Sequence, residues 1–239
     1  MWQKTLKKTI FTLNIDNYVP EITEITYPFI QHYAERIGAN FHVISDRKFP
    51  EYPISYEKFQ IYELAQEMGN DWNIYFDSDA LIHPETIDFT LHVQKDTVLH
   101  NDKDMANVRW KYDRFFYRDG RNIGSCNWFA IASDWCIELW KPLDDLAVGD
   151  AVRNIYPTVP ETDVGINSDH LIDDYVVSRN IAKYGLKFYS CRDLLAKLNL
   201  PLANFLFHQY TFSTEEKIRQ LKEVIVTWGL QNFLDQRPW

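Results

Sequence analysis

The sequence predicts one α/β domain built on a mostly parallel central sheet flanked by helices, with a less regular, mixed C-terminal half. Three observations lead to this prediction. Strand and helix patterns alternate over the first 80 residues in the order strand, helix, strand, helix, strand, which is typical of a parallel sheet. The chain has 239 residues, a length that one layered domain can hold. Its composition, 46% hydrophobic and 25% charged, is that of an ordinary globular protein.

The first half of the chain supplies the regular alternation. β-branched and aromatic residues predict three strands, over 9–15, 40–45 and 72–76. A helix is predicted from Pro20, with Gly38 as its end and Pro28 as a kink. Its apolar residues recur at spacings of three and four, namely Ile22, Ile25, Phe29, Tyr33 and Ile37. A second helix is predicted over 55–68, with Ser55 as its N-cap.

The second half is less regular. Strands are predicted over 97–100, 127–132 and 186–190. Ser133 is expected to cap a short helix, and a longer helix is predicted over 168–184, ending at Gly185. Ser213 and Glu216 form a capping-box pattern that opens the last helix. The apolar face of this helix comprises Ile218, Leu221, Ile225 and Trp228. Two segments are interpreted as loops or ribbons, 108–120 and 149–167.

Composition and charge exclude several classes of function. The net charge of −9, without a basic stripe, argues against nucleic acid polymers as partners, because their binding depends on Lys and Arg. No apolar run approaches the ~20 residues of a transmembrane helix. The three cysteines, Cys126, Cys136 and Cys191, show no CxxC spacing, which favours a reducing, cytoplasmic location. Aromatic residues make up 15% of the chain, a weak indication of carbohydrate or nucleotide ligands.

Asp77-Ser78-Asp79 is the sharpest chemical feature. These residues directly follow the apolar strand 72–76, and ligands of open α/β sheets bind at the carboxyl ends of the strands. Two carboxylates one residue apart repel each other, and a hard divalent cation such as Mg²⁺ or Mn²⁺ would remove this cost. The alternative is a solvated acidic turn. The apolar residues on both sides favour a functional site.

The run 72–82 (WNIYFDSDALI) resembles the DxD segment of GT-A-fold, nucleotide-sugar-dependent glycosyltransferases. Three further segments are similar to parts of these enzymes. They are 121–131, which resembles the N-x-G strand, 169–175, which resembles an acidic helix start, and 207–209, which resembles a late metal-binding histidine. The resemblance spans roughly residues 9 to 210. It implies a hexosyl- or pentosyltransferase that uses Mn²⁺ or Mg²⁺ to move a sugar from a nucleoside-diphosphate sugar, most simply a UDP-sugar, to a glycan or other hydroxyl acceptor.

The resemblance also implies roles for individual residues. The metal ligands would be Asp77, Asp79 and His208. The residues expected to contact the nucleotide sugar are Thr12, Asn14, Asp46, Lys58, Asp77, Ser78, Asn122 and Gly124. Within the single domain 1–239, residues 1–100 would form the nucleotide-binding half and residues 101–239 the acceptor-binding half.

Several of these residues have an alternative interpretation. Lys58 lies near the start of a predicted helix, where a bound phosphate would compensate its charge, or its side chain extends to solvent. His208 lies in an apolar stretch and is either a metal ligand or a hydrogen-bonded core residue. As a ligand, it predicts that activity falls when the pH drops through the histidine range near ~6.5. Either Asp173 or Asp174 is expected to face the cleft, as a general base or a donor-sugar contact, with Asp173 preferred. Asn122 and Gly124 could equally form a plain turn.

Two other functions compete with the glycosyltransferase. One is a phosphohydrolase or phosphotransferase with a DxD nucleophile. That chemistry usually places its aspartates after the first strand, whereas Asp77 follows the third predicted strand. The other is a non-catalytic carbohydrate-binding module built on the aromatic residues. Such a module would bind glycan without nucleotide or metal.

Overall fold

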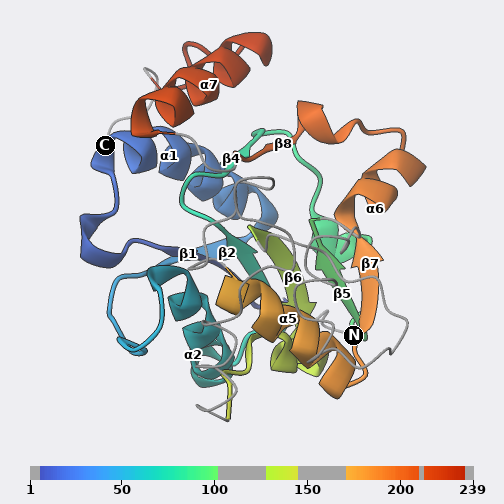
Figure 1. Ribbon diagram of the computed structural model, residues 1–239. Helices are drawn as coiled ribbons and strands as arrows, with labels where there is room; N and C mark the ends of the chain where they lie inside the picture. The colour runs from blue at the N-terminus through green and yellow to red at the C-terminus, as the bar shows by residue number, and fades with distance from the viewer. Residues whose placement is uncertain (1–5, 102–127, 145–170, 210–212, 235–239) are drawn as a thin grey trace, which may run out of the picture.

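The computed structural model describes residues 6–101, 128–144, 171–209 and 213–234 (Figure 1). The predictions for 108–120 and 149–167, and those for Asn122 and Gly124, lie outside the described residues. The division of the domain into a nucleotide-binding and an acceptor-binding half stays a prediction, although one sheet contains strands from both halves.

A six-stranded sheet forms the centre of the fold. Its strands are β1 (Lys8–Leu13), β2 (Ala39–Ile44), β3 (Trp72–Phe76), β5 (Thr97–His100), β6 (Phe129–Ser133) and β7 (Lys187–Ser190). Their spatial order is β2-β1-β3-β6-β5-β7. β1 pairs in parallel with β2 and β3, and β5 pairs in parallel with β7, whereas β6 is antiparallel to both of its neighbours. The sheet is therefore mostly parallel, as the sequence predicts.

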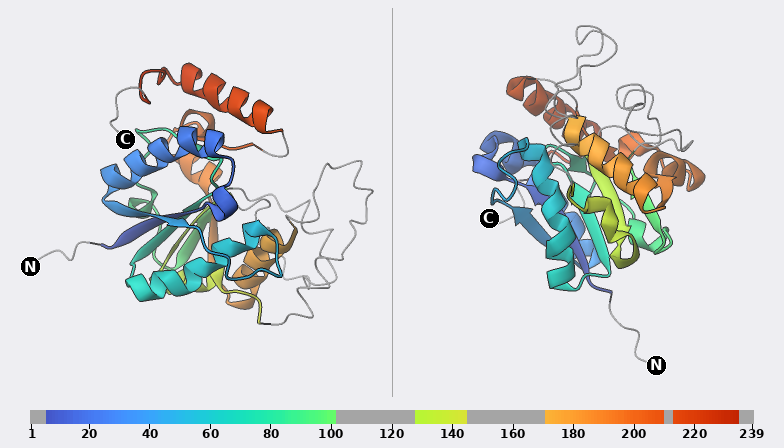
Figure 2. Two further views of the ribbon diagram at one scale, coloured as in Figure 1. Left: turned by 90° about the vertical axis from the view of Figure 1, so that its left-hand side faces the viewer. Right: turned by 60° about the horizontal axis from the view of Figure 1, so that its bottom comes forward.

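Helices cover both faces of the sheet (Figures 1 and 2). The helices are α1 (Pro20–Ile37), α2 (Ile61–Met68), α5 (Leu171–Lys183), α6 (Cys191–Lys197) and α7 (Thr214–Thr227). The 3-10 helices are η1 (Ile15–Asn17), η2 (Ile54–Gln60), η3 (Phe89–Leu91), η4 (Asp134–Trp140) and η7 (Leu202–Asn204). α1 lies on one face, with α7 packed on its outer side, whereas α2, η4 and α5 lie on the other.

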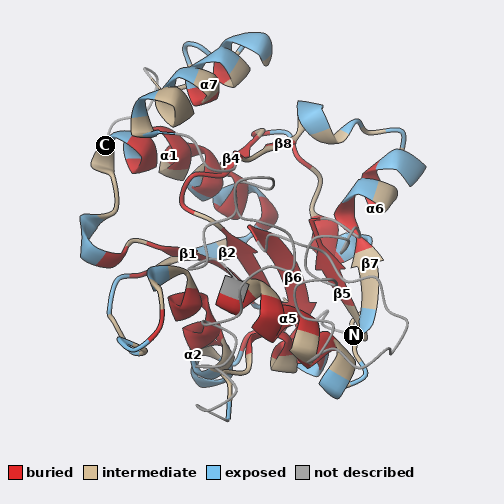
Figure 3. Cartoon of the chain, viewed as in Figure 1, coloured by how far each residue is buried: buried red, intermediate tan, exposed pale blue. Residues whose placement is uncertain are grey.

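The two faces of the sheet have separate hydrophobic cores. Phe11 and Tyr75 point into the core under α2 and α5, whereas Ile10 and Ile74 point into the core under α1 and α7. Successive strand residues point to opposite faces, so a strand covered on both sides is buried along its whole length. Every residue of β1 and β3 is buried accordingly (Figure 3).

Most predicted elements form, and two predictions in the first half need correction. β3 and β5 have the predicted bounds, and α1 runs through Pro28 to a left-handed Gly38. The segment predicted as one helix over 55–68 begins instead as the 3-10 helix η2, and the α-helix starts only at Ile61. Ser55 does not cap it: Pro53 precedes η2, and no side-chain cap bond is made there. Tyr56 to Gln60 are all buried, which one apolar stripe of an α-helix cannot achieve.

The helix caps predicted in the C-terminal half of the chain form as expected. The Ser133 hydroxyl accepts a hydrogen bond from the Trp135 amide, and Ser213 accepts one from Glu216. Gly185 follows α5 in the left-handed conformation. Within the parts of the chain that the structure describes, the helices are all too short or too polar to cross a bilayer.

Candidate metal centre

The DxD turn follows β3 and is hydrogen-bonded to the end of the neighbouring strand β1. Asp77 follows β3, and its amide donates to the Trp128 carbonyl at 2.8 Å. The Ser78 hydroxyl donates to the Leu13 carbonyl, and the Thr26 hydroxyl donates to the Ser78 carbonyl at 2.5 Å. The middle residue of the motif thus anchors the turn between β1 and α1. Its two aspartates are left to project from the carboxyl edge of the sheet.

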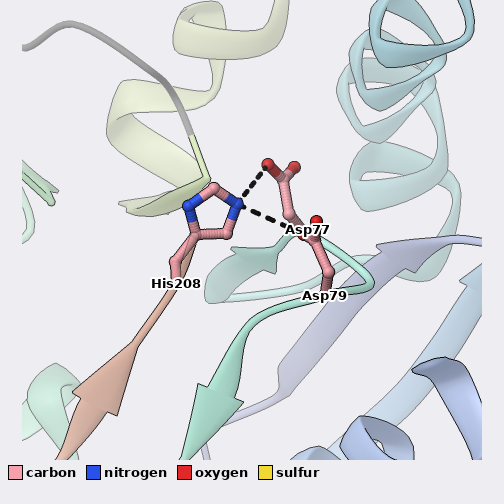
Figure 4. A group of neighbouring side chains, drawn as sticks. All are labelled: Asp77, Asp79 and His208. Atoms are coloured by element: carbon pink, nitrogen blue, oxygen red, sulfur yellow. Dashed lines mark ion pairs between the residues drawn. The ribbon is translucent and has the colours of Figure 1, made fainter. Parts of the chain in front are cut away.

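A two-stranded ladder brings His208 to this turn. β4 (Leu81–Ile82) pairs antiparallel with β8 (Leu206–Phe207), with Leu81 opposite Phe207. Since β4 starts two residues after Asp79 and His208 comes directly after β8, the register places the imidazole beside the DxD turn (Figure 4). The Trp128 indole stacks on the His208 ring at a centroid distance of 5.1 Å and 3° between planes, which fixes the ring orientation.

Asp77, Asp79 and His208 form the one group of three potential metal ligands found within the described part of the chain. His208 Nε2 lies 3.5 Å from Asp77 Oδ2 and 3.2 Å from Asp79 Oδ1. Ligand atoms at about 2.1 Å from one ion and at right angles to each other are about 3 Å apart. The imidazole nitrogen is therefore spaced from each carboxylate much as two ligands of one divalent ion would be, and all three residues offer ligand atoms within 4.8 Å of one another. Two carboxylates with one imidazole suit Mn²⁺ at least as well as Mg²⁺.

The charges of the cluster compensate each other in the absence of an ion. Burial alone would lower the pKa of His208, but the carboxylates of Asp79 and Asp77 outweigh it and raise this pKa to about 9. Burial would likewise raise the pKa of Asp77, yet Lys58 and His208 hold it well below its usual range. The pKa of Asp79 is also lowered, despite burial, mainly by His208. At neutral pH the metal-free site therefore contains two carboxylates bridged by an imidazolium.

Lys58 connects the DxD turn to α5. Its ammonium lies 2.7 Å from Asp173 Oδ2 and 3.6 Å from Asp77 Oδ1, above the Tyr75 ring. The Tyr75 hydroxyl donates to the same Asp77 oxygen at 2.5 Å. The Lys58 side chain is only 1% exposed, which rules out the alternative in which it extends to solvent. The predicted contact with a phosphate stays a prediction. Burial alone would lower the pKa of Lys58, but the carboxylates of Asp173 and Asp77 outweigh this effect and raise it above its ordinary value. The ammonium therefore stays charged.

Asp173 and Asp174 differ in their surroundings. Asp173 is buried, and its second oxygen, Oδ1, has no hydrogen-bond partner in the described structure. Asp174 is half-buried and lies close enough to Lys58 to raise the pKa of the lysine. The structure thus brings Asp173 into the ionic network of the DxD turn, on the side away from His208.

The residues predicted to contact the nucleotide lie at the same edge of the sheet. Thr12 is the penultimate residue of β1, Asn14 follows β1 and Asp46 follows β2, and these strands run parallel to β3. Thr12 is fully buried, whereas the Asp46 side chain is exposed. Asn14 Oδ1 is buried and has no hydrogen-bond partner among the described residues. Ser78 is nearby, but its hydroxyl bonds to a backbone carbonyl.

Sequence reasoning missed four residues around the cluster, one of which is Tyr75. Lys217, in the first turn of α7, donates a hydrogen bond to Asp79 Oδ2, and Tyr18 bonds to Lys217 in turn. Trp128 covers the face of the His208 ring. Its position near the start of the strand predicted over 127–132 was the one available signal. Nothing in the sequence connects Lys217 with Asp79, from which it is 138 positions away.

Comparisons with known proteins place the fold. No protein-family model matches the sequence, and no curated protein is similar to it in sequence. Solved structures do match. The galactosyltransferase LgtC in complex with donor and acceptor sugar analogs shares 12% identity over 92% of this chain and 95% of that chain, with a TM-score of 0.52. A glycosyltransferase involved in glycosylation of the major capsid of PBCV-1 shares 12% identity over 90% of this chain and 98% of that chain, with a TM-score of 0.50. The chain therefore has the GT-A fold, as its resemblance to these enzymes implies.

Proposed function

We propose that this chain is a metal-dependent glycosyltransferase, which moves a hexose or pentose from a nucleoside-diphosphate sugar, with a UDP-sugar as the first candidate, to a glycan or other hydroxyl acceptor. One observation carries the proposal: two carboxylates and an imidazole converge at the carboxyl edge of a GT-A sheet. A galactosyltransferase of the same fold has been solved with donor and acceptor sugar analogs. The low sequence identity leaves the donor and the acceptor to be found by experiment.

The nucleotide would lie over the ends of β1 and β2, next to the DxD turn. This is where open α/β sheets bind ligands. Asn14 Oδ1, which is buried and has no partner among the described residues, supports the assignment, because such an acceptor calls for a donor group, which a base or ribose supplies. Thr12, Asp46 and Lys58 stay candidates for the same ligand. In this arrangement residues 1–100 serve the nucleotide and residues 101–239 the acceptor.

Asp77, Asp79 and His208 would hold the ion, Mn²⁺ or Mg²⁺. When bound, it would neutralise the charge that develops on the departing nucleoside diphosphate. The chain contributes the orientation of its ligands. Tyr75 and Lys58 fix the Asp77 carboxylate, and the Trp128 indole fixes the plane of the imidazole.

The ion pair with Lys58 bears on the role of Asp173. Asp173 pairs with Lys58 through Oδ2 at 2.7 Å, so an acceptor alcohol would have to displace the buried ammonium to reach that oxygen. Its free Oδ1 can still accept a hydrogen bond from a sugar hydroxyl. We therefore assign Asp173 to the donor sugar and keep Asp174, which is half-buried, as the candidate base. The test is Asp174→Asn, which should lower turnover without weakening binding of the nucleotide.

A thermal-shift series tests the function as a whole. UDP, GDP, dTDP and CMP are each added with and without Mn²⁺, and Asp79→Asn serves as the matched variant. A ligand at about 100 times its dissociation constant adds about 2.7 kcal/mol of stability, which is roughly 5–10 °C for a chain of this size. We expect such a shift for one nucleotide, only with Mn²⁺ and only in the wild type. A non-catalytic glycan-binding module would not show this pattern, and the absence of any metal-dependent shift refutes the proposal.

We also propose that the protein works in a reducing compartment, the cytoplasm in the simplest case. Cys136 and Cys191 are buried free thiols, which supports this location. Free thiols that persist in a preparation made without reductant, counted with a thiol reagent after unfolding, would agree with it. An intermolecular disulfide would contradict it.

A further inference from the structure

Lys217 reaches the candidate metal site from a rigid part of the fold. It lies four residues after Ser213, which caps α7, and this helix is packed against α1 through Leu221 and Ile225. Its ammonium donates to Asp79 Oδ2, and its side chain is 17% exposed. A cation near a helix N-terminus is disfavoured by the helix dipole. The carboxylate of Asp79 therefore compensates Lys217, and Lys217 compensates Asp79.

The contact occupies the carboxylate that a metal ion would use. Asp79 Oδ1 faces His208 Nε2 at 3.2 Å, and Oδ2 accepts from Lys217, so both oxygens are engaged. An ion bound to Asp79 would share that carboxylate with an ammonium, and two cations on one carboxylate repel each other strongly in a poorly solvated site. Either the ion binds weakly or the ammonium leaves.

The two lysines of the cluster differ in their freedom to leave. Lys58 is 1% exposed and held by Asp173 at 2.7 Å, so moving it would strand a buried carboxylate. Lys217 has the more open position and a second polar neighbour, the Tyr18 hydroxyl, near which it could stay. Lys217 is therefore the cation that can be exchanged.

We propose that Lys217 is a placeholder for the metal: it holds the Asp79 carboxylate in the metal-free protein, weakens the binding of a free divalent ion, and releases the carboxylate when the ion arrives together with a nucleoside diphosphate. The inference rests on the proposed metal site and concerns the order in which its ligands bind. The diphosphate brings negative charge, which offsets the repulsion between ion and ammonium. Lys217 thereby couples the two ligands, and by linkage each raises the affinity for the other by the same factor.

The test measures Mn²⁺ binding directly, by the electron paramagnetic resonance signal of the unbound ion, with and without UDP. Lys217→Met removes the ammonium and keeps an unbranched apolar chain. Lys222→Met is the matched control, because Lys222 lies on the same helix and is exposed. Lys217→Gln is a second variant in case the first does not fold, and circular dichroism checks both.

We expect Lys217→Met to bind Mn²⁺ alone on the order of 10–100-fold more tightly than the wild type, the range for losing a competing charged hydrogen bond. UDP should then raise its Mn²⁺ affinity by a correspondingly smaller factor. Adding Asp79→Asn should abolish the gain, and Lys222→Met should behave as the wild type.

Two results overturn the placeholder and leave the metal site standing. One is unchanged or weaker Mn²⁺ binding by Lys217→Met, while both proteins still bind Mn²⁺ in the presence of UDP. The other is an unchanged coupling factor between UDP and Mn²⁺. If neither protein binds Mn²⁺ with or without UDP, the metal centre itself fails, and both proposals fall with it.

Discussion

The metal-free protein should lose stability as the pH rises, because its histidine at the DxD turn is charged in the folded state. The pKa of His208 is raised to about 9, from the 6.5 of an unfolded histidine. A raised folded-state pKa means that the folded protein holds the proton more tightly. Its contribution to stability is fully present below pH 6.5 and is lost as the pH rises through about 9.

The expected magnitude follows from the same two values. Each pKa unit corresponds to 1.36 kcal/mol, so the shift of His208 is worth about 3 kcal/mol. The side chain is only 6% exposed, and solvent screening removes little of this energy. We expect the free energy of unfolding in a chelator to fall by an amount of this order between pH 6.5 and pH 9.5.

Urea unfolding at pH 6.5, 7.5, 8.5 and 9.5 measures the effect, and His208→Asn is the essential comparison. Burial raises the pKa of the Cys136 thiol to about 11 and also raises that of Cys191, so both proteins lose stability above about pH 8.5. The difference between the two pH profiles isolates the histidine. His92→Asn, at an exposed position, should keep the wild-type profile. Parallel profiles for wild type and His208→Asn would refute the bridged imidazolium.

The proton on His208 should also control the affinity for Mn²⁺. An ion cannot bind the imidazole until the proton leaves, so Mn²⁺ affinity should rise about tenfold per pH unit up to about pH 9 and then level off. The sequence alone places this transition near 6.5, the value of an ordinary histidine. The two neighbouring carboxylates move it upward.

Three further perturbations test other parts of the site. Asp79→Asn should fold yet lose at least 10–100-fold in Mn²⁺ affinity, measured by paramagnetic resonance, since it removes a direct ligand; wild-type affinity would demote the motif to a surface turn. Lys58→Met should cost about 3–5 kcal/mol in urea unfolding, because the Asp173 carboxylate is left buried and unpaired; adding Asp173→Asn should restore part of this, and two additive losses would contradict the pair. Ser133→Ala should cost about 1 kcal/mol by loss of its cap to the Trp135 amide, and no loss would mean that the cap is dispensable.

The fold was predictable wherever periodicity is strong. β3 and the stripe of α1 follow directly from residue patterns, because burial on both faces or on one stripe leaves a clear signal. The elements that were missed are short or depend on tertiary contacts. β4 and β8 have two residues each, too few for any pattern, and α6 has seven. η2 buries Glu57, Lys58 and Gln60, whose partners lie elsewhere in the chain and follow no local pattern.

The site was predictable to the extent that it is local. The aspartates of the DxD turn share one segment, and the apolar strand before them indicates where they lie. The pair of Lys58 with Asp173 spans 115 positions, and no spacing rule connects them. Resemblance, not periodicity, pointed to His208. The charge state of the site could not be predicted from the sequence, because it depends on which charged groups the fold brings together.

One C-terminal segment supplies both the third proposed metal ligand, His208, and the cation proposed to compete with the ion, Lys217. β8 is held beside β4 by its two-residue ladder and by the His83 amide, which donates to the Phe205 carbonyl at 2.8 Å. α7 follows and carries Lys217 to the other oxygen of Asp79. Because strand residues alternate in direction, a slip of one residue in this ladder would turn His208 away from the carboxylates. The DxD turn, in contrast, is anchored to β1 and α1 independently of this segment. The affinity of the proposed metal site should therefore depend on how the C-terminal segment docks on this separately anchored turn.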